Sequence, residues 1–113
     1  MKNMILGMLL LFVASSTQAQ GKKSKNAKHN IEVNGSCEMC KKRIEKAAFS
    51  VTGVKSAEWN IENHMLDLII NEEKCSLSDI TKAIAKVGHD TDDDKATEEE
   101  YGKLHGCCLY ERK

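Results

Sequence analysis

Apolar and polar residues alternate in three short stretches of the sequence, each bounded by polar residues or glycine. The apolar positions are Ile31 and Val33 within residues 30–34, then Ala57, Trp59 and Ile61, and then Leu66, Leu68 and Ile70. A two-residue period of this kind predicts β-strands that bury one face. The polar pair Asn63-His64 between the second and third stretches predicts a hairpin turn.

Two longer stretches repeat their apolar residues with the period of an α-helix. The first begins at Cys40 and ends at Thr52-Gly53, and its apolar residues are Ile44, Ala47, Ala48 and Val51. In the second, Ser76 and Asp79 have the spacing of a capping box, and Gly88 occupies the position of a glycine that ends a helix. Its apolar residues are Leu77, Ile80, Ile84 and Val87.

The order strand, helix, strand, strand, helix predicts an α+β fold, the ferredoxin-like βαββαβ sandwich. Because each strand has one apolar face, both helices are expected on one face of an antiparallel sheet. His89-Asp90-Thr91, followed by three Asp residues, predicts only a short or distorted fourth strand at the edge. Residues 97–104 are expected to form one or two helical turns, with Tyr101 and Leu104 packing on the domain.

Residues 1–19 have the layout of a secretory signal peptide. Lys2 precedes an apolar run from Met4 to Ala14, and small residues surround a cleavage site after Ala19. The run is too short for a permanent anchor, so no stable membrane insertion is expected after cleavage, although a retained membrane helix is the alternative. The sequence therefore predicts a periplasmic or secreted protein.

Composition divides the remaining chain into three parts. Residues 20–29 are basic and predict a flexible leader, residues 30–92 form one domain, and residues 93–113 form an extension that is first acidic and then contains Cys. The chain has 17 Lys and Arg and 17 Asp and Glu, so loss of Lys2 leaves a net charge near −1. Such a balance gives no general attraction to nucleic acid.

All five cysteines follow the predicted signal peptide: Cys37, Cys40, Cys75, Cys107 and Cys108. An odd number of thiols cannot all pair within one exported chain, so at least one is expected to be free, reduced or metal-bound. Cys75 precedes the second helix, at the end of the sheet opposite Cys37. It is expected to be a half-buried structural thiol.

The sequence CEMC at residues 37–40 lies between a strand and the start of a helix. Two thiols three residues apart can converge on one ion, and a helix N-terminus favours the thiolate that binds metal. Lys41 and Lys42 are expected to offset the thiolate charge. Sulfur ligands select soft ions, and two of them suit Cu(I) or Hg(II), whereas Zn(II) normally takes four. Cu(I) is therefore the expected ion, with Hg(II) and Zn(II) as alternatives.

Residues 30–90 resemble a heavy-metal-associated (HMA) domain, the module of copper chaperones, copper-ATPase N-terminal domains and periplasmic mercury-binding proteins. The resemblance rests on three segments, IEVNGSCEMCKKRIEKA, TGVKSAEWNIENHMLDLII and SLSDITKAIAKVGHD. It implies the βαββαβ fold and metal binding through Cys37 and Cys40. It also implies a partner with its own CxxC site, either a metal-transporting P-type ATPase or an efflux component.

Two features depart from the family pattern. The family commonly has Met two residues before the first Cys, as a buried loop anchor, but Gly35-Ser36-Cys37 has none. Met39 is the candidate replacement for that anchor. The family's minimal domain also lacks the extension over residues 93–113.

Three further residues are candidate ligands. In βαββαβ topology the exit of the second helix lies at the same end of the sheet as the CxxC loop, so His89 is a candidate third ligand or gate. A surface His without a role is the alternative, and His64 in the hairpin lies at the same end. Cys107 and Cys108 are candidate auxiliary ligands that close over the loop or form a second site. A disulfide between them, or simple packing, is the alternative.

The sequence thus predicts an exported metallochaperone or heavy-metal resistance protein that transfers or sequesters a soft ion, and not an enzyme. No Ser-His-Asp arrangement, phosphate-binding Gly loop or pair of acids suggests catalysis. One alternative is a structural zinc module of Cys37, Cys40, Cys107 and Cys108, which would unfold without metal. Another is a thiol–disulfide oxidoreductase, but thioredoxin-like sites need a cis-Pro and the chain has no Pro.

Overall fold

The computed structural model describes residues 23–112 of the chain. The predicted signal peptide and residues 20–22 of the predicted leader lie outside the described residues. Within residues 23–112, no helix has both the length and the apolar character needed to cross a membrane.

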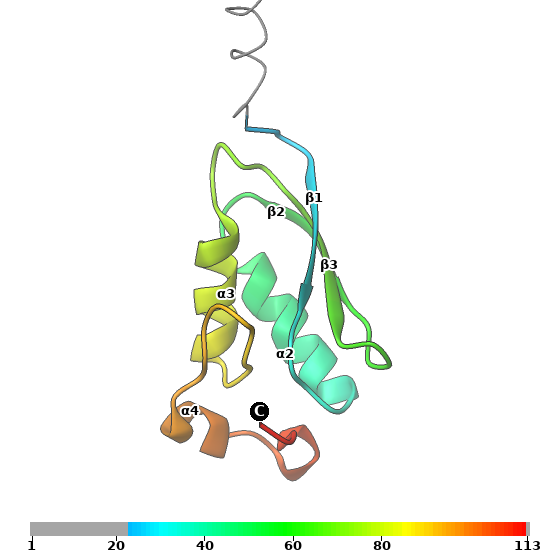
Figure 1. Cartoon of the computed structure of the whole chain (residues 1–113), viewed down its shortest axis with the longest axis vertical. Coiled ribbons are helices and arrows are strands. Elements are labelled where there is room, and N and C mark those ends of the chain that lie inside the picture. Colours follow the sequence, from blue (N-terminus) through cyan, green and yellow to red (C-terminus); the bar gives the residue numbers. More distant parts are fainter. Residues whose placement is uncertain (1–22, 113) are drawn as a thin grey trace, which may run out of the picture.

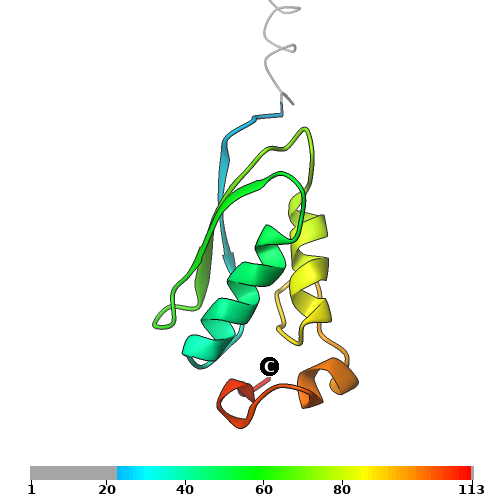
Figure 2. The ribbon, with the colours of Figure 1, turned by 180° about the vertical axis from the view of Figure 1, so that it is seen from behind.

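The described part of the chain folds into an antiparallel sheet with two helices on one of its faces (Figure 1). The strands are β1 (Ala27–Glu32), β2 (Val54–Trp59) and β3 (Met65–Ile70), in the order β1-β3-β2. Helices α2 (Glu38–Phe49) and α3 (Leu77–Lys86) lie side by side against the sheet, as Figure 2 shows from behind. The predicted α+β class and ferredoxin-like order are confirmed.

The hydrophobic core lies between the two helices and the sheet. Its large, fully buried apolar side chains are Val33, Ile44, Trp59, Leu66, Leu68, Ile70, Ile80 and Ile84. All of them occupy the apolar positions of the predicted strands and helices, so the periodicity identified the buried faces correctly. Burial of this apolar surface is the main favourable term in folding. Aliphatic and aromatic side chains supply most of it, beside the buried thiols of Cys40, Cys75 and Cys108.

Strand β1 begins at Ala27, whereas a strand from Asn30 and a flexible leader up to residue 29 were expected. Ala27 pairs with Ile70, so β1 uses the whole length of β3. Beyond the strand, the Glu72 N–H donates to the Ser24 carbonyl at 2.8 Å, and the Ser24 N–H donates to the Glu72 carboxylate at 3.0 Å. The domain therefore begins earlier than expected. The length of β1 is determined by its pairing with β3 and not by the local apolar pattern.

The expected fourth strand is reduced to a single antiparallel bridge between Val33 and Thr91. Next to it, the Asn34 N–H donates to the Asp90 carbonyl at 2.9 Å. The chain then turns, because the Thr91 N–H donates to the Asp94 carbonyl at 2.9 Å and Thr91 Oγ1 accepts the Asp94 N–H at 3.1 Å. Short polar side chains stabilise such a turn and end the strand.

Helix α3 has the predicted ends. Ser76 Oγ accepts the Asp79 N–H while the Asp79 carboxylate accepts the Ser76 N–H, which confirms the capping box. Gly88 follows the last helical turn with a φ of 100°. This left-handed conformation ends helices and favours glycine.

Strand β2 ends at Trp59, so Ile61 is not the buried strand residue that was expected and is 36% exposed. Asn60 causes the earlier turn, because its side-chain oxygen accepts the N–H groups of Glu62 at 2.8 Å and Asn63 at 3.2 Å. His64 lies in the same turn with a φ of 63°.

The C-terminal extension lies across the ends of the two helices, below the start of α2 and the end of α3 in Figures 1 and 2. It contains α4 (Glu98–Gly102) and the 3-10 turn η1 (Gly106–Cys108), which contacts α2. Thr97 caps α4. Leu104 is buried and Tyr101 packs against the core, so the expected packing of both residues is confirmed.

Candidate metal centre

Cys37 and Cys40 lie where the loop after β1 enters α2. Cys37 is the N-cap residue, with extended backbone, and its carbonyl accepts the Lys41 N–H at 3.1 Å. Cys40 lies in the first turn and is fully buried, whereas Cys37 is half-buried. The two sulfur atoms are 3.5 Å apart. The start of α2 therefore brings both thiols together and leaves one of them accessible.

Trp59 supports this loop from the core. Its indole N–H donates to the carbonyls of Val33 at 3.0 Å and His64 at 3.2 Å. A Cβ atom at Gly35 would lie 3.1 Å from the Trp59 ring and from Cys40 Cβ, so the loop passes close over the indole. Whether Met39 replaces the family's buried Met was left open by the sequence, and its side chain, which is 41% exposed, does not replace it. Trp59 fills the space beneath the loop.

The extension brings two further thiols to the same place. Cys107 Sγ lies 2.9 Å and Cys108 Sγ lies 3.2 Å from Cys37 Sγ. The sulfur atoms of Cys37, Cys40 and Cys108 all lie within 4.8 Å of one another. Cys108 is fully buried, Cys107 is exposed, and both are free thiols. We call Cys37, Cys40, Cys107 and Cys108 the thiol cluster.

Hydrogen bonds make the thiols of the cluster unequal. Burial raises the pKa of Cys37, but hydrogen bonds from the Cys107 and Cys108 thiols and from Cys40 together lower it to about 6. Burial, and then the neighbouring Cys40 and Cys37, raise the pKa of Cys108 well above its usual range. The hydrogen bond to Cys37 raises the pKa of Cys107. At neutral pH the metal-free cluster therefore favours one thiolate, at Cys37, among protonated neighbours.

Lys41 does not supply the charge that was expected of it. Its ammonium group donates to the Glu45 carboxylate at 2.7 Å and to the Trp59 carbonyl at 2.8 Å. The positive charge is thus paired with Glu45. The N-terminus of α2 remains as the feature of this helix that favours a thiolate.

His89 is fully buried, so the alternative of a surface histidine is wrong. Its Nδ1 lies 2.8 Å from the Asn34 carbonyl, and its ring stacks on Tyr110 with centroids 5.5 Å apart. Among the described residues, its Nε2 has no hydrogen-bond partner. Burial lowers the pKa of His89, which favours the neutral ring. His89 is not a member of the group formed by Cys37, Cys40 and Cys108.

His64 and Cys75 make packing and hydrogen-bond contacts outside the thiol cluster. The ring of His64 stacks on Trp59 with centroids 5.6 Å apart. Cys75 is buried just before α3, and its thiol donates to the Asn71 carbonyl at 3.7 Å. Neither residue belongs to the group formed by Cys37, Cys40 and Cys108.

Three residues that the sequence did not single out hold the end of the extension on the domain. The Arg112 guanidinium makes two hydrogen bonds of 2.9 Å to the buried Asp90 carboxylate. The Tyr110 hydroxyl donates to the Gly88 carbonyl at 2.8 Å and accepts the Asp90 N–H at 2.9 Å. We call these contacts of Asp90, Tyr110 and Arg112 the latch. No local pattern links residue 90 to residues 110–112, so the latch emerges only from the fold.

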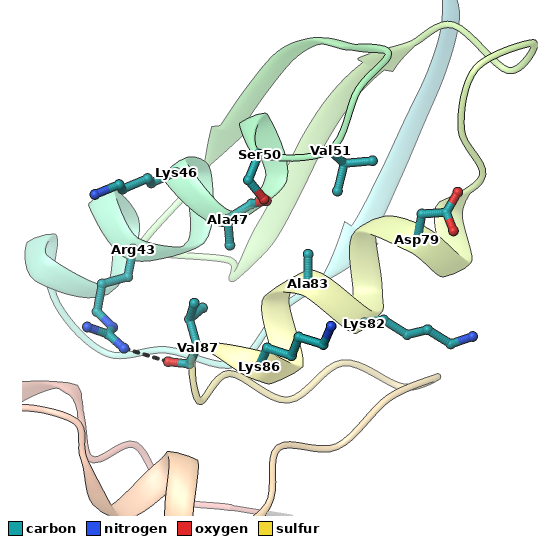
Figure 3. Close-up of a pocket in the computed structure, with 10 residues that line it drawn as sticks. All are labelled: Arg43, Lys46, Ala47, Ser50, Val51, Asp79, Lys82, Ala83, Lys86 and Val87. Carbon is teal, nitrogen blue, oxygen red and sulfur yellow. Dashed lines mark hydrogen bonds between the residues drawn. The ribbon is translucent and has the colours of Figure 1, made fainter.

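A basic groove of about 690 Å³ lies between α2 and α3 and contains no thiol (Figure 3). The Arg43 guanidinium crosses one end of it and donates to the Val87 carbonyl at 2.7 Å. Its lining is Arg43, Lys46, Ala47, Ser50, Val51, Asp79, Lys82, Ala83, Lys86 and Val87. With four cationic residues and one acidic residue over an apolar floor, the groove is suited to a negatively charged surface.

Comparison with known proteins gives one family. The sequence model of the heavy-metal-associated domain family matches residues 31–90 of the chain. The copper chaperone CopZ of Staphylococcus epidermidis is 34% identical over 61 residues, which cover 53% of this chain and 90% of CopZ. CopZ of Staphylococcus aureus strain RF122 is 36% identical over 61 residues, with the same coverage.

Solved structures show the same fold. A CopZ metallochaperone superimposes with a TM-score of 0.56 and 32% identity, covering 57% of this chain and 98% of its own. The N-terminal domain of a potential copper-translocating P-type ATPase of Bacillus subtilis, in the Cu(I)-loaded state, gives 0.56 and 28%, covering 58% and 84%. Oxidised MerP of Ralstonia metallidurans CH34 gives 0.51 and 24%, covering 57% and 94%. The family match contains Cys37, Cys40 and His89 and ends before Cys107 and Cys108.

Proposed function

The chain belongs to the heavy-metal-associated (HMA) domain family, and from this premise we propose that it carries Cu(I) between Cys37 and Cys40 and passes it on by ligand exchange. The ion is cargo, so the protein acts as a metallochaperone or sequestering protein and not as an enzyme. Binding of metal is supported by the similarity to copper chaperones together with the group of thiols at the start of α2.

The convergence of Cys37 and Cys40 is the observation that carries the proposal. Sulfur ligands prefer soft ions, and the start of α2 favours the thiolate form. Cys40 is fully buried, while Cys37 is half-buried and can be reached from outside. A thiolate of a partner can therefore approach the ion from the side of Cys37 and take it over by exchange.

Cu(I) is the proposed ion because a small number of sulfur ligands suits it and because several similar proteins are named for copper. Hg(II) and Zn(II) are the alternatives. Each would be identified by the metal content of protein isolated from its own compartment. X-ray absorption at the edge of that metal would give its sulfur coordination.

The proposed partner is a metal-transporting P-type ATPase or efflux component with its own CxxC site. One structural neighbour is the N-terminal domain of a potential copper-translocating P-type ATPase, in the Cu(I)-loaded state. The basic groove between α2 and α3 supports docking of an acidic surface, because opposite charges speed association. The pattern of residues 1–19 supports delivery in the periplasm or outside the cell.

A structural zinc site is the second candidate, because four thiols gather at one place. Closed Zn(II) sites of this kind use four sulfur ligands and stabilise the fold directly. The large apolar core supports the carrier instead, because Cys40 and Cys108 are only a small part of it and most of its side chains are aliphatic.

Replacement of Cys37 and Cys40 by Ser tests the carrier proposal. The double variant is expected to lose tight Cu(I) binding in a competition with a Cu(I) chelator, while its circular dichroism stays close to that of the unchanged protein. Cys75→Ser is the matched control, because this thiol lies outside the cluster, and it is expected to bind Cu(I) normally. Undiminished affinity in the double variant would refute the assignment of the two ligands.

A further inference from the structure

The cluster contains a thiol that the HMA match does not include but that the fold places next to Cys37 and Cys40. Cys108 Sγ lies 3.2 Å from Cys37 Sγ. The sulfur atoms of Cys37, Cys40 and Cys108 all lie within 4.8 Å of one another. Cys108 has no exposed surface. A buried thiol directed at two others has the position of a ligand.

The spacing of the CxxC sulfurs is shorter than a two-coordinate site requires. With metal–sulfur bonds of about 2.3 Å, two sulfurs are about 4.6 Å apart in a linear site, about 4.0 Å in a trigonal site and about 3.8 Å in a tetrahedral site. Cys37 Sγ and Cys40 Sγ are 3.5 Å apart, closer to a site with more than two ligands, and Cys108 is the thiol that forms a group with both. The Cys37–Cys108 separation of 3.2 Å is likewise shorter than the sulfur–sulfur separations of these metal sites. A small opening of the three sulfurs would therefore suit a three-coordinate soft ion.

The extension holds Cys108 in this place without metal. On its N-terminal side, the Cys108 N–H donates to the His105 carbonyl at 2.8 Å, and the Ser36 hydroxyl donates to the Cys107 carbonyl. On its C-terminal side, the Tyr110 N–H donates to the Cys108 carbonyl at 2.8 Å, which connects the thiol to the latch. The CxxC loop and the latch thus fix the segment at two points, and pre-organised ligands bind more tightly.

We propose that Cys108 is a third sulfur ligand of the ion carried by Cys37 and Cys40, and that the latch of Asp90, Tyr110 and Arg112 positions it. The inference rests on the proposed function. Binding replaces the thiol proton of Cys108 by the metal, and the proton passes to solvent. Cys107, which is exposed, stays outside the coordination sphere. The extension therefore retains the cargo, and a partner receives it by displacing Cys108.

X-ray absorption of the Cu(I)-loaded, monomeric protein tests this assignment. Three sulfur ligands are expected for the unchanged protein and for the control variants Cys75→Ser and Cys107→Ser, and two are expected for Cys108→Ser. Two sulfurs in the unchanged protein would overturn the inference. So would three sulfurs in Cys108→Ser, or a loss of one sulfur in Cys107→Ser alone.

The rate of Cu(I) release to a chelator gives a second measurement. One of its variants, Arg112→Gln, changes the latch and keeps every cysteine. Cys108→Ser is expected to release Cu(I) at least about tenfold faster, and Arg112→Gln, which weakens the latch, several-fold faster. Circular dichroism and thermal unfolding separate these effects from loss of the fold. Equal release rates in all folded variants would overturn the inference.

The two proposals fail in different ways. If Cys37→Ser plus Cys40→Ser retains Cu(I) binding, the proposed function is wrong. If that variant loses binding but the unchanged protein holds Cu(I) by two sulfurs regardless of Cys108, only the role of Cys108 is wrong.

Discussion

Neighbouring thiols make Cys37 chemically different from the other cysteines of the cluster. Its sulfur accepts hydrogen bonds from Cys107 and Cys108, which lie 70 and 71 residues away in the sequence. These contacts and those of Cys40 outweigh burial and bring the pKa of Cys37 to about 6. The most reactive thiol is therefore selected by the extension as well as by the helix that begins at this residue.

The alkylation rate of Cys37 in reduced, metal-free protein should follow this pKa. A thiol reacts as its thiolate, so the rate should be nearly constant above pH 7, fall to about half near pH 6 and decrease about tenfold by pH 5. Peptide mass spectrometry after short exposure to iodoacetamide measures the rate at each cysteine. In Cys107→Ala plus Cys108→Ala the midpoint should rise. A midpoint near 8.5, the usual value of a free thiol, in the unchanged protein would contradict this prediction.

The support of the CxxC loop shows what sequence could and could not predict for single residues. Alternation placed Trp59 on the buried face of its strand, and this is correct. The bonds from its indole N–H to Val33 and His64 join three segments that the pattern treats separately. Met39 was an open candidate for the loop anchor because of its place within CxxC, but its side chain on α2 is exposed to solvent. Local spacing does not determine which side chain fills a space formed by several elements.

For single elements, the start of α3 offers a direct test of a predicted feature. Ser76→Ala removes the oxygen that accepts the Asp79 N–H and should lower the free energy of unfolding by about 1 kcal/mol. Ser78→Ala is the control, because Ser78 is exposed within the same helix. Urea denaturation measures both variants. Equal stability of the two would show that the capping box contributes nothing.

The latch stabilises the extension through a buried charge. Burial raises the pKa of Asp90, but hydrogen bonds from Arg112 and the Ala96 N–H outweigh burial and hold the pKa below its usual value. A carboxyl group with a lowered pKa stabilises the folded state above its unfolded pKa of about 3.9, and this contribution is lost as the pH falls through the lower folded value. The latch should therefore be fully effective at neutral pH and weaken in strong acid.

Asp90→Asn should lower the free energy of unfolding by about 2 kcal/mol at pH 7, because it removes the charge that Arg112 binds. The difference between the variant and the unchanged protein should begin to shrink below about pH 4, where Asp90 is protonated in the unfolded state, and should be lost as the pH falls through the lower pKa of the folded state. Asp92→Asn, at an exposed position, is the control. Denaturant unfolding at several pH values measures the difference, and a constant difference down to pH 2 would contradict the expectation.

The elements were predictable where their own residues determine them. The periodicity of α3 and its Ser76 and Gly88 ends are examples. Strand β1 and the edge bridge at Thr91 were less predictable, because the first depends on the length of β3 and the second on a local turn with Asp94. Pairing partners and competing turns are not contained in the pattern of a single segment.

For the whole molecule, the thiol cluster lies at one end of the hydrophobic core, which includes Cys40 and Cys108. The core lies between the sheet and helices α2 and α3, and most of its side chains are aliphatic. The cluster lies at one end, where the extension crosses α2. Most of the apolar surface that drives folding therefore comes from side chains that do not bind metal.

Removal of metal should leave the protein folded. After treatment with a chelator and a reducing agent, far-ultraviolet circular dichroism should be nearly unchanged, and unfolding by heat should remain cooperative. Loss of the cooperative transition without metal would favour the structural zinc site instead. Readdition of Cu(I) should raise the midpoint, because a ligand that binds the folded state stabilises it.

The position of the CxxC loop followed from topology, since the loop after the first strand and the exit of the second helix lie at the same end. Closure of Cys107 and Cys108 over the loop was one of several alternatives, and topology did not decide among them. Residues 93–106 separate these thiols from the domain, and Leu104 and the latch fix their path. His89 was predicted at the correct end but lies in the interior, where Tyr110 covers it. Tertiary contacts of the extension thus determine the positions of Cys107 and Cys108 and the burial of His89.

Gly88 is the point where the end of α3 and the C-terminal extension lie in direct contact. It needs a left-handed backbone to end α3, and a Cβ atom there would lie 2.9 Å from the Glu100 carbonyl oxygen and 3.0 Å from Leu104 Cδ2. Any larger residue would strain the helix end and at the same time push away the segment that carries Cys108. One position thus sets both the end of α3 and the room for the extension, so the placement of Cys108 depends on the backbone of the domain as well as on the latch.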